Sequence, residues 1–462
     1  MDDTGADTIE FGTDGWRATL SEFTTRRVRM VGQGVATYLD DESQTGPVAV
    51  GYDAREHSRG FAEELARVLA ANGRDVTLAE RDCPTPVLAW TVTDGDYAGG
   101  LMITASHNPP EYNGVKFLPA DGTPALPAVT DAIEARLAAP EPEPDESFGS
   151  AEERDLVTPF SDHAVAMVPD DLDGLPVLYD AMHGSGRGVT DALLKRAGAD
   201  VTRLRCSRDP EFGGTPPEPV PERAGELVER VTGGEAALGF INDGDADRIG
   251  VVTPERGFLD PNVYLAVLYD YLLESGEGDV VRTVSTNSLV DRVAEDHGQS
   301  VHETAVGFKW VAEAMGEFDA RCGGEESGGY GVTAHLRNKD GVLVALVTAA
   351  AEADRSLDDR IDDLLARHGG VVQNRVGVEC PDDRKASVLD ELQETLPDSV
   401  AGVDVADVNT VDGFKIFLAD DTWVLVRPSG TEPKLRVYAE AGSESRVGEL
   451  LEAGRGMVEP LV

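Results

Sequence analysis

A chain of 462 residues is too long for a single hydrophobic core, and at roughly 100 to 200 residues per domain it is expected to divide into three or four units. Its 41% hydrophobic and 27% charged residues indicate a globular protein and exclude a mainly disordered one. The 86 Asp and Glu against 40 Lys and Arg leave a net charge of −46, which disfavours nucleic-acid binding. Because the acids are spread along the chain, they indicate a surface adapted to high salt; the alternative is an acidic protein that binds basic partners.

Export, membrane insertion and a disulfide framework are all disfavoured. The first twelve residues contain neither a basic nor an apolar segment, and the longest apolar run, residues 342–351, is far shorter than the ~20 residues that span a bilayer. The cysteines are far apart and form no CxxC pair or Cys/His cluster: Cys83, Cys206, Cys322 and Cys380. We therefore expect a protein of the reducing cytoplasm without a zinc site.

Short apolar runs alternate with amphipathic helical stretches. The predicted strands include residues 48–52, 100–104, 177–180 and 237–242. A helix is predicted over residues 61–71, ended by Gly73, and another over 189–197, with Thr190 as its N-cap and Gly198 at its end. This order predicts layered α/β domains with partly parallel sheets, whose chemistry lies in loops at the strand ends.

Domain boundaries are indicated by composition. Residues 139–155 are rich in Pro and Glu without periodicity, which predicts a solvated linker. Softer boundaries fall near residues 254–261 and 368–370. The predicted domains are residues 1–150, 151–256, 257–369 and 370–462.

The first segment that can carry chemistry is TASHNPPEYNGVK, residues 104–116, directly after an apolar strand. Ser106 in a turn stiffened by Pro and Asn-Gly, with His107 beside it and Lys116 further on, is a candidate phosphate acceptor with proton-transfer groups nearby. A polar turn with a capping serine is the alternative. The patterns GxxxxGK[ST], GxSxG, HExxH and GxGxxG do not occur, which disfavours a P-loop kinase, an α/β-hydrolase, a zincin and a dinucleotide-binding domain.

The second segment is NDGDADR, residues 242–248, in which Asp243, Asp245 and Asp247 alternate. In a tight loop their carboxylates can converge on one hard cation, which relieves their mutual repulsion. A helix-loop-helix calcium site is disfavoured, because its sixth position would be Arg248 instead of Gly and its twelfth Pro254 instead of Glu. Mg²⁺ beside a phosphate fits better, with Arg248 free to bind phosphate oxygens; a surface turn is the alternative.

Two further segments are rich in ligand-binding groups. In CGGEESGGYG, residues 322–331, the glycines allow close approach of a ligand, and Glu325 and Ser327 offer acceptors for sugar hydroxyls. In RPSGTEPKLR, residues 427–436, Arg427 and the hydroxyls and amides of residues 429–431 predict an anion nest for a phosphate monoester. The alternatives are an ordinary glycine-rich turn and a basic turn that pairs with the acidic surface.

Together, TASHNPPEYNGVK, DGDADR, GEESGG and RPSGTEPKLRVY resemble the four signature loops of the α-D-phosphohexomutase superfamily, in the same order and at similar separations. FGTDGWR, residues 11–17, and GYDAR, residues 51–55, are similar to its N-terminal strands. The resemblance covers about residues 10–440. It implies three similar α/β domains with mixed sheets and a smaller α+β C-terminal domain around a central cleft, with one loop from each domain.

The resemblance also implies roles for the site residues. Ser106 would be the phosphoserine that binds Mg²⁺ together with Asp243, Asp245 and Asp247. Arg17, His107 and Lys116 would lie near the reacting group, without a division of acid and base duties. The groups expected to bind substrate are Arg248, Lys309, Glu325, Ser327, Arg427, Ser429, Gly430 and Thr431.

The implied activity interconverts hexose 1-phosphate and hexose 6-phosphate, with a hexose 1,6-bisphosphate as intermediate and activator. Gly329 stands where phosphoglucosamine mutases and many bacterial phosphomannomutases of the family carry His, so glucose or mannose phosphate is expected ahead of glucosamine phosphate. A sugar-phosphate phosphatase and a non-catalytic sugar-phosphate-binding protein also stay open. No nucleic-acid or membrane partner is expected, and the sequence leaves the oligomeric state open.

Overall fold

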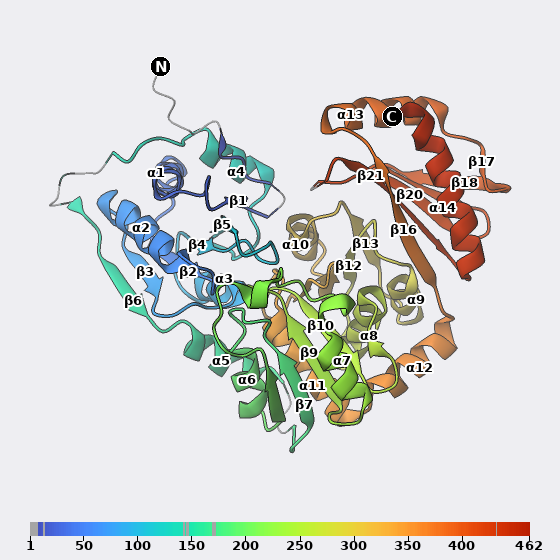
Figure 1. Cartoon of the computed structure of the whole chain (residues 1–462), viewed down its shortest axis with the longest axis horizontal. Coiled ribbons are helices and arrows are strands. Elements are labelled where there is room, and N and C mark those ends of the chain that lie inside the picture. Colours follow the sequence, from blue (N-terminus) through green and yellow to red (C-terminus); the bar gives the residue numbers. More distant parts are fainter. Residues whose placement is uncertain (1–7, 13, 142–143, 145–146, 169–171, 431) are drawn as a thin grey trace.

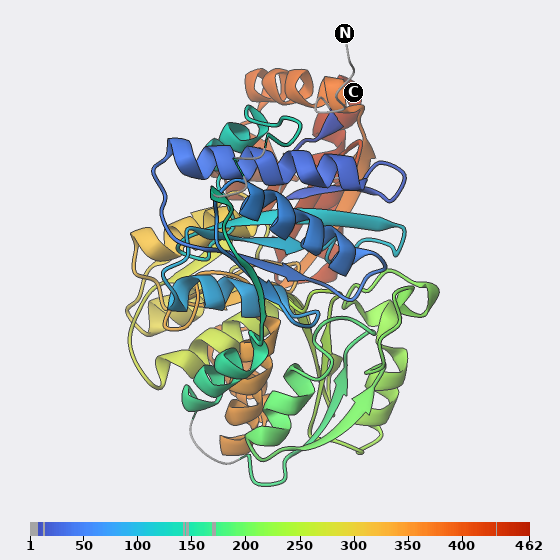
Figure 2. The same ribbon diagram turned by 90° about the vertical axis from the view of Figure 1, so that its left-hand side faces the viewer.

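In the computed structural model, which describes residues 8–12, 14–141, 144, 147–168, 172–430 and 432–462, the chain forms four sheets, each accompanied by helices (Figures 1 and 2). The first three units are layered α/β, and the last is a smaller α+β domain, as the sequence and the family resemblance predicted. Within the described residues, every helix is too short or too polar to cross a lipid bilayer.

The first domain contains a six-stranded sheet with four interior strands. Its strands, in spatial order, are β1 (Trp16–Thr19), β5 (Tyr112–Pro119), β4 (Gly99–Ile103), β2 (Val48–Tyr52), β3 (Val76–Ala79) and β6 (Ala151–Arg154). Its helices are α1 (Thr25–Asp41), α2 (Ser58–Ala71), α3 (Thr85–Asp94) and α4 (Pro127–Glu134). The central strands β2 and β4 pair in parallel and are buried along their whole length, which explains their continuous apolar runs. The serine loop follows β4 directly.

One part of the predicted linker is wrong. The strand β6 lies inside residues 139–155 and pairs in parallel with β3 at the edge of the first sheet. All four of its side chains are exposed, and its sequence, AEER, has no hydrophobic pattern. Because it is held by main-chain hydrogen bonds, its strand character left no signal in the sequence. The first sheet therefore ends at residue 154.

The second and third domains share one helix at their junction. The second sheet runs β11 (Gly257–Phe258), β10 (Ile249–Thr253), β9 (Leu238–Asn242), β7 (Pro176–Asp180) and β8 (Asp200–Leu204), with α5 (Val157–Ala166), α6 (Thr190–Arg196) and α7 (Gly225–Thr232). The third runs β13 (Val301–Thr304), β12 (Val280–Thr283), β14 (Cys322–Gly324) and β15 (Tyr330–Val332), with α8 (Pro261–Leu273), α9 (Leu289–Asp296), α10 (Phe308–Glu317), α11 (Gly341–Asp354) and α12 (Leu357–His368). Helix α11 packs on α6 and β9 of the second domain. It is therefore buried all round, which accounts for the apolar run 342–351.

The helix predicted over 189–197 is α6, but its start differs from the prediction. Thr190 is the first helical residue and makes no capping hydrogen bond. Its hydroxyl instead donates to the side-chain oxygen of Asn242 at 3.0 Å, at the carboxyl end of β9. The Thr190 hydroxyl therefore bonds to a buried side chain and does not cap the main-chain amides of the helix, as the sequence had suggested.

The fourth domain has a core of its own. Its antiparallel sheet runs β16 (Val372–Glu379), β21 (Lys434–Ala441), β20 (Trp423–Pro428), β19 (Phe414–Leu418), β18 (Val403–Asn409) and β17 (Ser399–Val400), with α13 (Asp382–Thr395) and α14 (Glu444–Val458). One hydrophobic cluster runs through the first three domains, and a separate one fills the fourth. A small cluster of Val284, Trp423, Leu425 and Tyr438 joins the third and fourth domains. The fourth domain is therefore the part of the molecule most able to move as a unit.

Candidate active site

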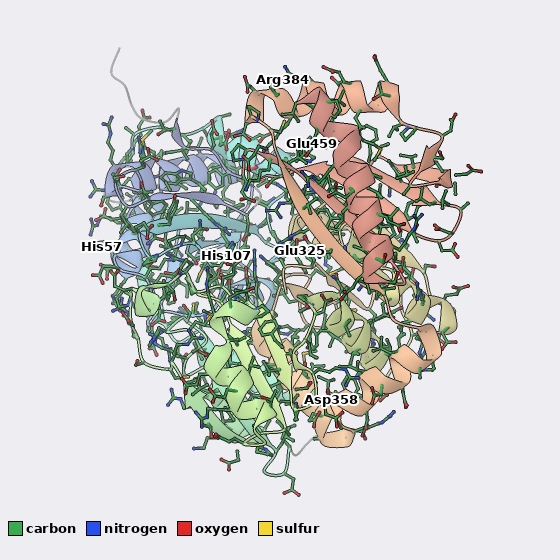
Figure 3. The ribbon with its side chains drawn as sticks, turned by 45° about the vertical axis from the view of Figure 1, so that its right-hand side comes forward. His57, His107, Glu325, Asp358, Arg384 and Glu459 are labelled. Carbon is green, nitrogen blue, oxygen red and sulfur yellow. The ribbon has the colours of Figure 1, made fainter. Side chains whose placement is uncertain are left out.

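A cleft of about 1040 Å³ lies where loops from all four domains meet. Figure 3 shows His107 and Glu325 in the interior between the domains, and Arg384 and Glu459 at the far end of the fourth domain. Most predicted site residues line the cleft: Arg17, His107, Arg248, Lys309, Glu325, Ser327, Arg427, Ser429 and Gly430. Ser106, Lys116 and the three aspartates are buried beside its floor. Thr431 lies outside the described residues.

Ser106 is held in an uncommon backbone conformation with its hydroxyl on a carboxylate. Its φ is +50°, in the left-handed region that non-glycine residues rarely adopt. The hydroxyl donates to Oδ2 of Asp243 at 2.6 Å and lies 3.2 Å from Nδ1 of His107. The serine loop of the first domain thus touches the aspartate loop of the second. A side chain at Gly244 would lie 2.5 Å from the carbonyl oxygen of Ser106, so glycine is required for this approach.

Arg55 holds the serine loop through its main chain, a role that the sequence did not reveal. The guanidinium is buried and donates to four loop carbonyls, those of residues 106, 108, 109 and 112, at 2.6 to 3.1 Å. Asp53 pairs with it at 3.0 Å and also accepts the hydroxyl of Thr104. Thr104 in turn accepts the amide of Ser106 at 2.8 Å. The motif GYDAR therefore fixes the loop from beneath, and only the fold brings it there.

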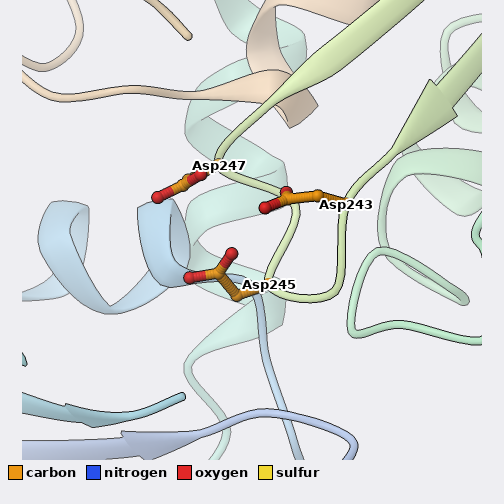
Figure 4. A group of neighbouring side chains, drawn as sticks. All are labelled: Asp243, Asp245 and Asp247. Atoms are coloured by element: carbon orange, nitrogen blue, oxygen red, sulfur yellow. The ribbon is translucent and has the colours of Figure 1, made fainter. Parts of the chain in front are cut away.

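The three aspartates follow β9 and direct their carboxylates into one shared space (Figure 4). One oxygen of each lies within 4.8 Å of the others. Oδ1 of Asp245 and Oδ1 of Asp247 are buried and accept no hydrogen bond from the described residues. Burial, and then repulsion from its two neighbours, raises the pKa of Asp243 well above its ordinary value. Buried orphan oxygens and crowded negative charge are what a divalent cation would satisfy, so the donor set fits a hard metal ion.

Two lysines and a further aspartate complete this centre. Nζ of Lys116 lies 3.0 Å from carboxylate oxygens of Asp14, Asp245 and Asp247. Nζ of Lys339 lies 2.9 Å from Asp247. Burial opposes the charge on Lys116, but the surrounding carboxylates outweigh it and hold its pKa well above the usual value. Asp14 and Lys339 were not predicted, because they come from a loop near the N-terminus and from the third domain.

The cleft above the aspartates is lined by nitrogen donors. The buried Nε atoms of Arg17 and Arg248 have no hydrogen-bond partner in the described part of the chain. The Arg248 cation, and then burial, lowers the pKa of His107 well below its usual value. A neutral imidazole and two arginines with unpaired N–H groups form a site that can bind an anion next to Ser106.

Glu325 and Ser327 lie on the turn between β14 and β15, where the Ser327 hydroxyl donates to Glu325 at 3.2 Å. Lys309, at the start of α10, lines the same cleft, and burial lowers its pKa. A Cβ atom at Gly329 would lie 2.5 Å from Cδ of Lys339, so Lys339 takes up the space that a larger residue would need there.

The C-terminal loop follows β20 and forms the cationic end of the cleft. Nε of Arg427 pairs with Asp412 at 2.9 Å, and the amide of Ser429 donates to the carbonyl of Lys434 at 2.9 Å. Lys385, which the sequence did not single out, donates to the carbonyls of Ser429 and Glu432 at 2.6 Å. The cleft therefore has an acidic, metal-competent end and a cationic end on separate domains.

A serine hydroxyl is hydrogen-bonded to a carboxylate of the candidate metal site, and a cationic pocket lies at the other end of the cleft. This arrangement is typical of an enzyme that transfers phosphoryl groups. The chain belongs to the phosphoglucomutase/phosphomannomutase family, within the α-D-phosphohexomutase superfamily. Its alpha/beta/alpha domains I, II and III match residues 8–143, 158–257 and 260–368, and its C-terminal domain matches residues 376–455. The enzymes of this family are intramolecular phosphotransferases.

Several relatives cover nearly the whole chain. A probable phosphoglucosamine mutase of Methanopyrus kandleri is 36% identical, covering 95% of each chain. A phosphoglucomutase/phosphomannomutase of Thermococcus kodakarensis is 32% identical, covering 97% of this chain and 98% of the relative. A crystal structure described as a phosphomannomutase from Thermus thermophilus is 33% identical, with a TM-score of 0.84 and coverage of 98% and 99%. The names of the relatives thus differ in the hexose.

Proposed function

We propose that this mutase interconverts a hexose 1-phosphate and a hexose 6-phosphate, of glucose, mannose or both, through phosphorylated Ser106 and a bound 1,6-bisphosphate. The observation that carries the proposal is the hydrogen bond from Ser106 to Asp243 at one end of a cleft whose other end is cationic. Two phosphate-binding ends are needed, because the bisphosphate must turn around between the two transfers.

In the first half-reaction the phosphoryl group passes from Ser106 to the free hydroxyl of the bound monophosphate. The P–O bond to Ser106 breaks, the bond to the sugar oxygen forms, and the hydroxyl proton leaves to a group of the protein. The second half-reaction returns the other phosphoryl group to Ser106. Arg17 and Arg248 would bind the transferring group, with His107 and Lys116 beside it for proton transfer.

The metal proposed here is Mg²⁺, held by Asp243, Asp245, Asp247 and the oxygen of Ser106. Once bound, it would neutralise charge on the transferring phosphoryl group. Lys116 would help to hold two of these aspartates in place, since it pairs with Asp245 and Asp247.

The opposite end of the cleft would bind the sugar and the phosphate group that is not being transferred. Glu325 and Ser327 would accept sugar hydroxyls, and Lys309 lines the same cleft. The clamp on the non-transferring phosphate would consist of Arg427, Ser429, Gly430 and Thr431. Such remote binding energy positions the reacting hydroxyl.

A glucosamine phosphate is the second candidate substrate, because the Methanopyrus relative carries that name. Against it stands Gly329, whose neighbouring space is filled by Lys339. Sugars that differ by a single hydroxyl or amino group need a direct comparison of kcat/KM.

A coupled assay on glucose 1-phosphate, mannose 1-phosphate and glucosamine 1-phosphate, with trace bisphosphate, tests the proposal. We expect isomer formation from glucose or mannose phosphate. Highest kcat/KM on glucosamine phosphate would overturn the choice of hexose. Release of inorganic phosphate as fast as isomer would instead favour a phosphatase, in which water takes the phosphoryl group.

A further inference from the structure

Three arginines of the fourth domain face the cleft, and each is paired with a carboxylate of the chain itself. The strand register places Arg436 opposite Arg427 and Arg375 opposite Tyr438, so the three arginines share one face of the sheet. The pairs are Arg427 with Asp412 at 2.9 Å, Arg436 with Glu432 at 3.1 Å and Arg375 with Glu326 at 2.9 Å.

Glu326 differs from the other two acids, because it comes from another domain. Asp412 and Glu432 belong to the fourth domain, whereas Glu326 lies on the β14–β15 turn of the third, next to Glu325. Its Oε1 accepts hydrogen bonds from both Arg375 and the hydroxyl of Tyr438, each at 2.9 Å. One carboxylate oxygen therefore bridges the two domains across the cationic end of the cleft.

The energetics favour an exchangeable contact. The Arg375 side chain is 53% exposed and that of Glu326 is 20% exposed, so water reaches the pair from the arginine side and weakens its attraction. Burial raises the pKa of Glu326, so its negative charge is held at a cost. A phosphate monoester dianion offers more charge and more acceptor oxygens than one carboxylate, and it can accept hydrogen bonds from two N–H groups of a guanidinium at once.

We propose that Arg375 is a further ligand of the non-transferring phosphate and that Glu326 occupies its guanidinium while the cleft is empty. The inference rests on the proposed function, since it extends the clamp around Arg427. Substrate phosphate displaces the Glu326 carboxylate from Arg375, and this removes a polar link between the third and fourth domains. Because the fourth domain has its own core, the exchange couples phosphate binding to the joint between these domains.

Calorimetric titration with inorganic phosphate tests the exchange. Glu326→Gln keeps an acceptor for Tyr438 but removes the charge, and we expect phosphate to bind about two- to fivefold more tightly. Arg375→Met is expected to weaken binding about tenfold. The double variant should bind phosphate like Arg375→Met. The loss of phosphate affinity in Arg427→Met measures how much of the binding occurs at this end of the cleft. Glu449→Gln, in an exposed pair with Arg446 on α14, controls for the change in net charge.

Unchanged or weaker phosphate binding by Glu326→Gln would overturn the proposal. So would a double variant in which Glu326→Gln still tightens binding, because the effect would then bypass Arg375. The KM for the hexose 1-phosphate should follow the phosphate affinity, with a smaller change in kcat. The titration needs no turnover, so absence of mutase activity would refute the proposed function without deciding this test.

Discussion

The guanidinium of Arg55 donates a hydrogen bond of 2.6 Å to the main-chain carbonyl oxygen of Ser106. With three further carbonyls bound, Arg55 sets the path of the loop that carries the Ser106 hydroxyl. It does not line the cleft, so it would act as a positioning residue. The left-handed conformation of Ser106 needs such support, because the surrounding structure must offset its strain.

Arg55→Lys keeps the charge but loses the planar fork, and we expect kcat to fall about 100-fold with KM changed little, because small misplacement of a reacting group is costly. Steady-state kinetics and a melting curve measure the two effects separately. Arg67→Lys, in an exposed pair with Glu64, is the matched control. A wild-type kcat in Arg55→Lys would remove Arg55 from the positioning of Ser106.

Ser106→Ala is expected to abolish turnover and to leave the melting temperature close to that of the wild type. The hydroxyl is the proposed carrier, while the loop is held by Arg55 through main-chain groups that the variant keeps. Intact-mass spectrometry during turnover should detect one phosphate on the wild type and none on the variant. Undiminished activity of the variant would exclude Ser106 as the carrier.

Chelation of divalent ions is expected to stop the reaction, and added Mg²⁺ should restore it. Asp245→Asn should weaken Mg²⁺ binding by at least tenfold in a calorimetric titration, because it removes charge from a buried oxygen cluster. Asp162→Asn, in an exposed pair with Arg196, tests for a general charge effect. Equal Mg²⁺ affinity in both variants would argue against the aspartate loop as the metal site.

The stability of the chain should depend on pH through Glu352 on α11, whose pKa burial raises from 4.5 to about 7. Between these two pH values the folded state binds more protons than the unfolded chain. The stabilisation that the protonated Glu352 carboxyl contributes is therefore lost as pH rises from about 4.5 to 7. Glu352→Gln should raise the free energy of unfolding by about 1 to 2 kcal/mol at pH 8 and by much less at pH 5. Urea unfolding at both pH values measures the difference. An equal gain at both would contradict the prediction.

Salt should stabilise the protein strongly, because a net charge of −46 repels itself at low ionic strength. Raising KCl from 0.1 to about 1 M shortens the Debye length from about 10 to 3 Å, and we expect the melting temperature to rise steadily over this range. KCl is compared with equal ionic strengths of NaCl to separate screening from specific ion binding. A melting temperature independent of salt would show that the acids are not an adaptation to salt.

Contiguous segments were predicted well, because their signal lies in neighbouring residues. The strand over residues 48–52 is confirmed as β2, since complete burial leaves an unbroken apolar run. The aspartate loop was recognisable because its three acidic residues alternate within five positions, and the structure does bring their carboxylates together. The hexose and the roles of the individual site residues stay predictions.

Partners far apart in the chain could not be predicted. Arg55 contacts the serine loop, Lys339 meets Asp247, and Glu326 bridges to Arg375, each across domains or across distant strands. The polar strand β6 and the buried partner of Thr190 were equally beyond prediction, because local patterns do not record such main-chain pairing or buried side-chain partners.

The sequence by itself determined the order of the elements, the family and the four loops, since periodicity and short motifs depend on neighbouring residues. Only the tertiary structure decided which charges face one another. In a chain with so many carboxylates, the positions of the sheets decide which acid pairs with which base. Lys116 becomes part of the site only because the fold brings three acids that are distant in sequence within ion-pair distance of it.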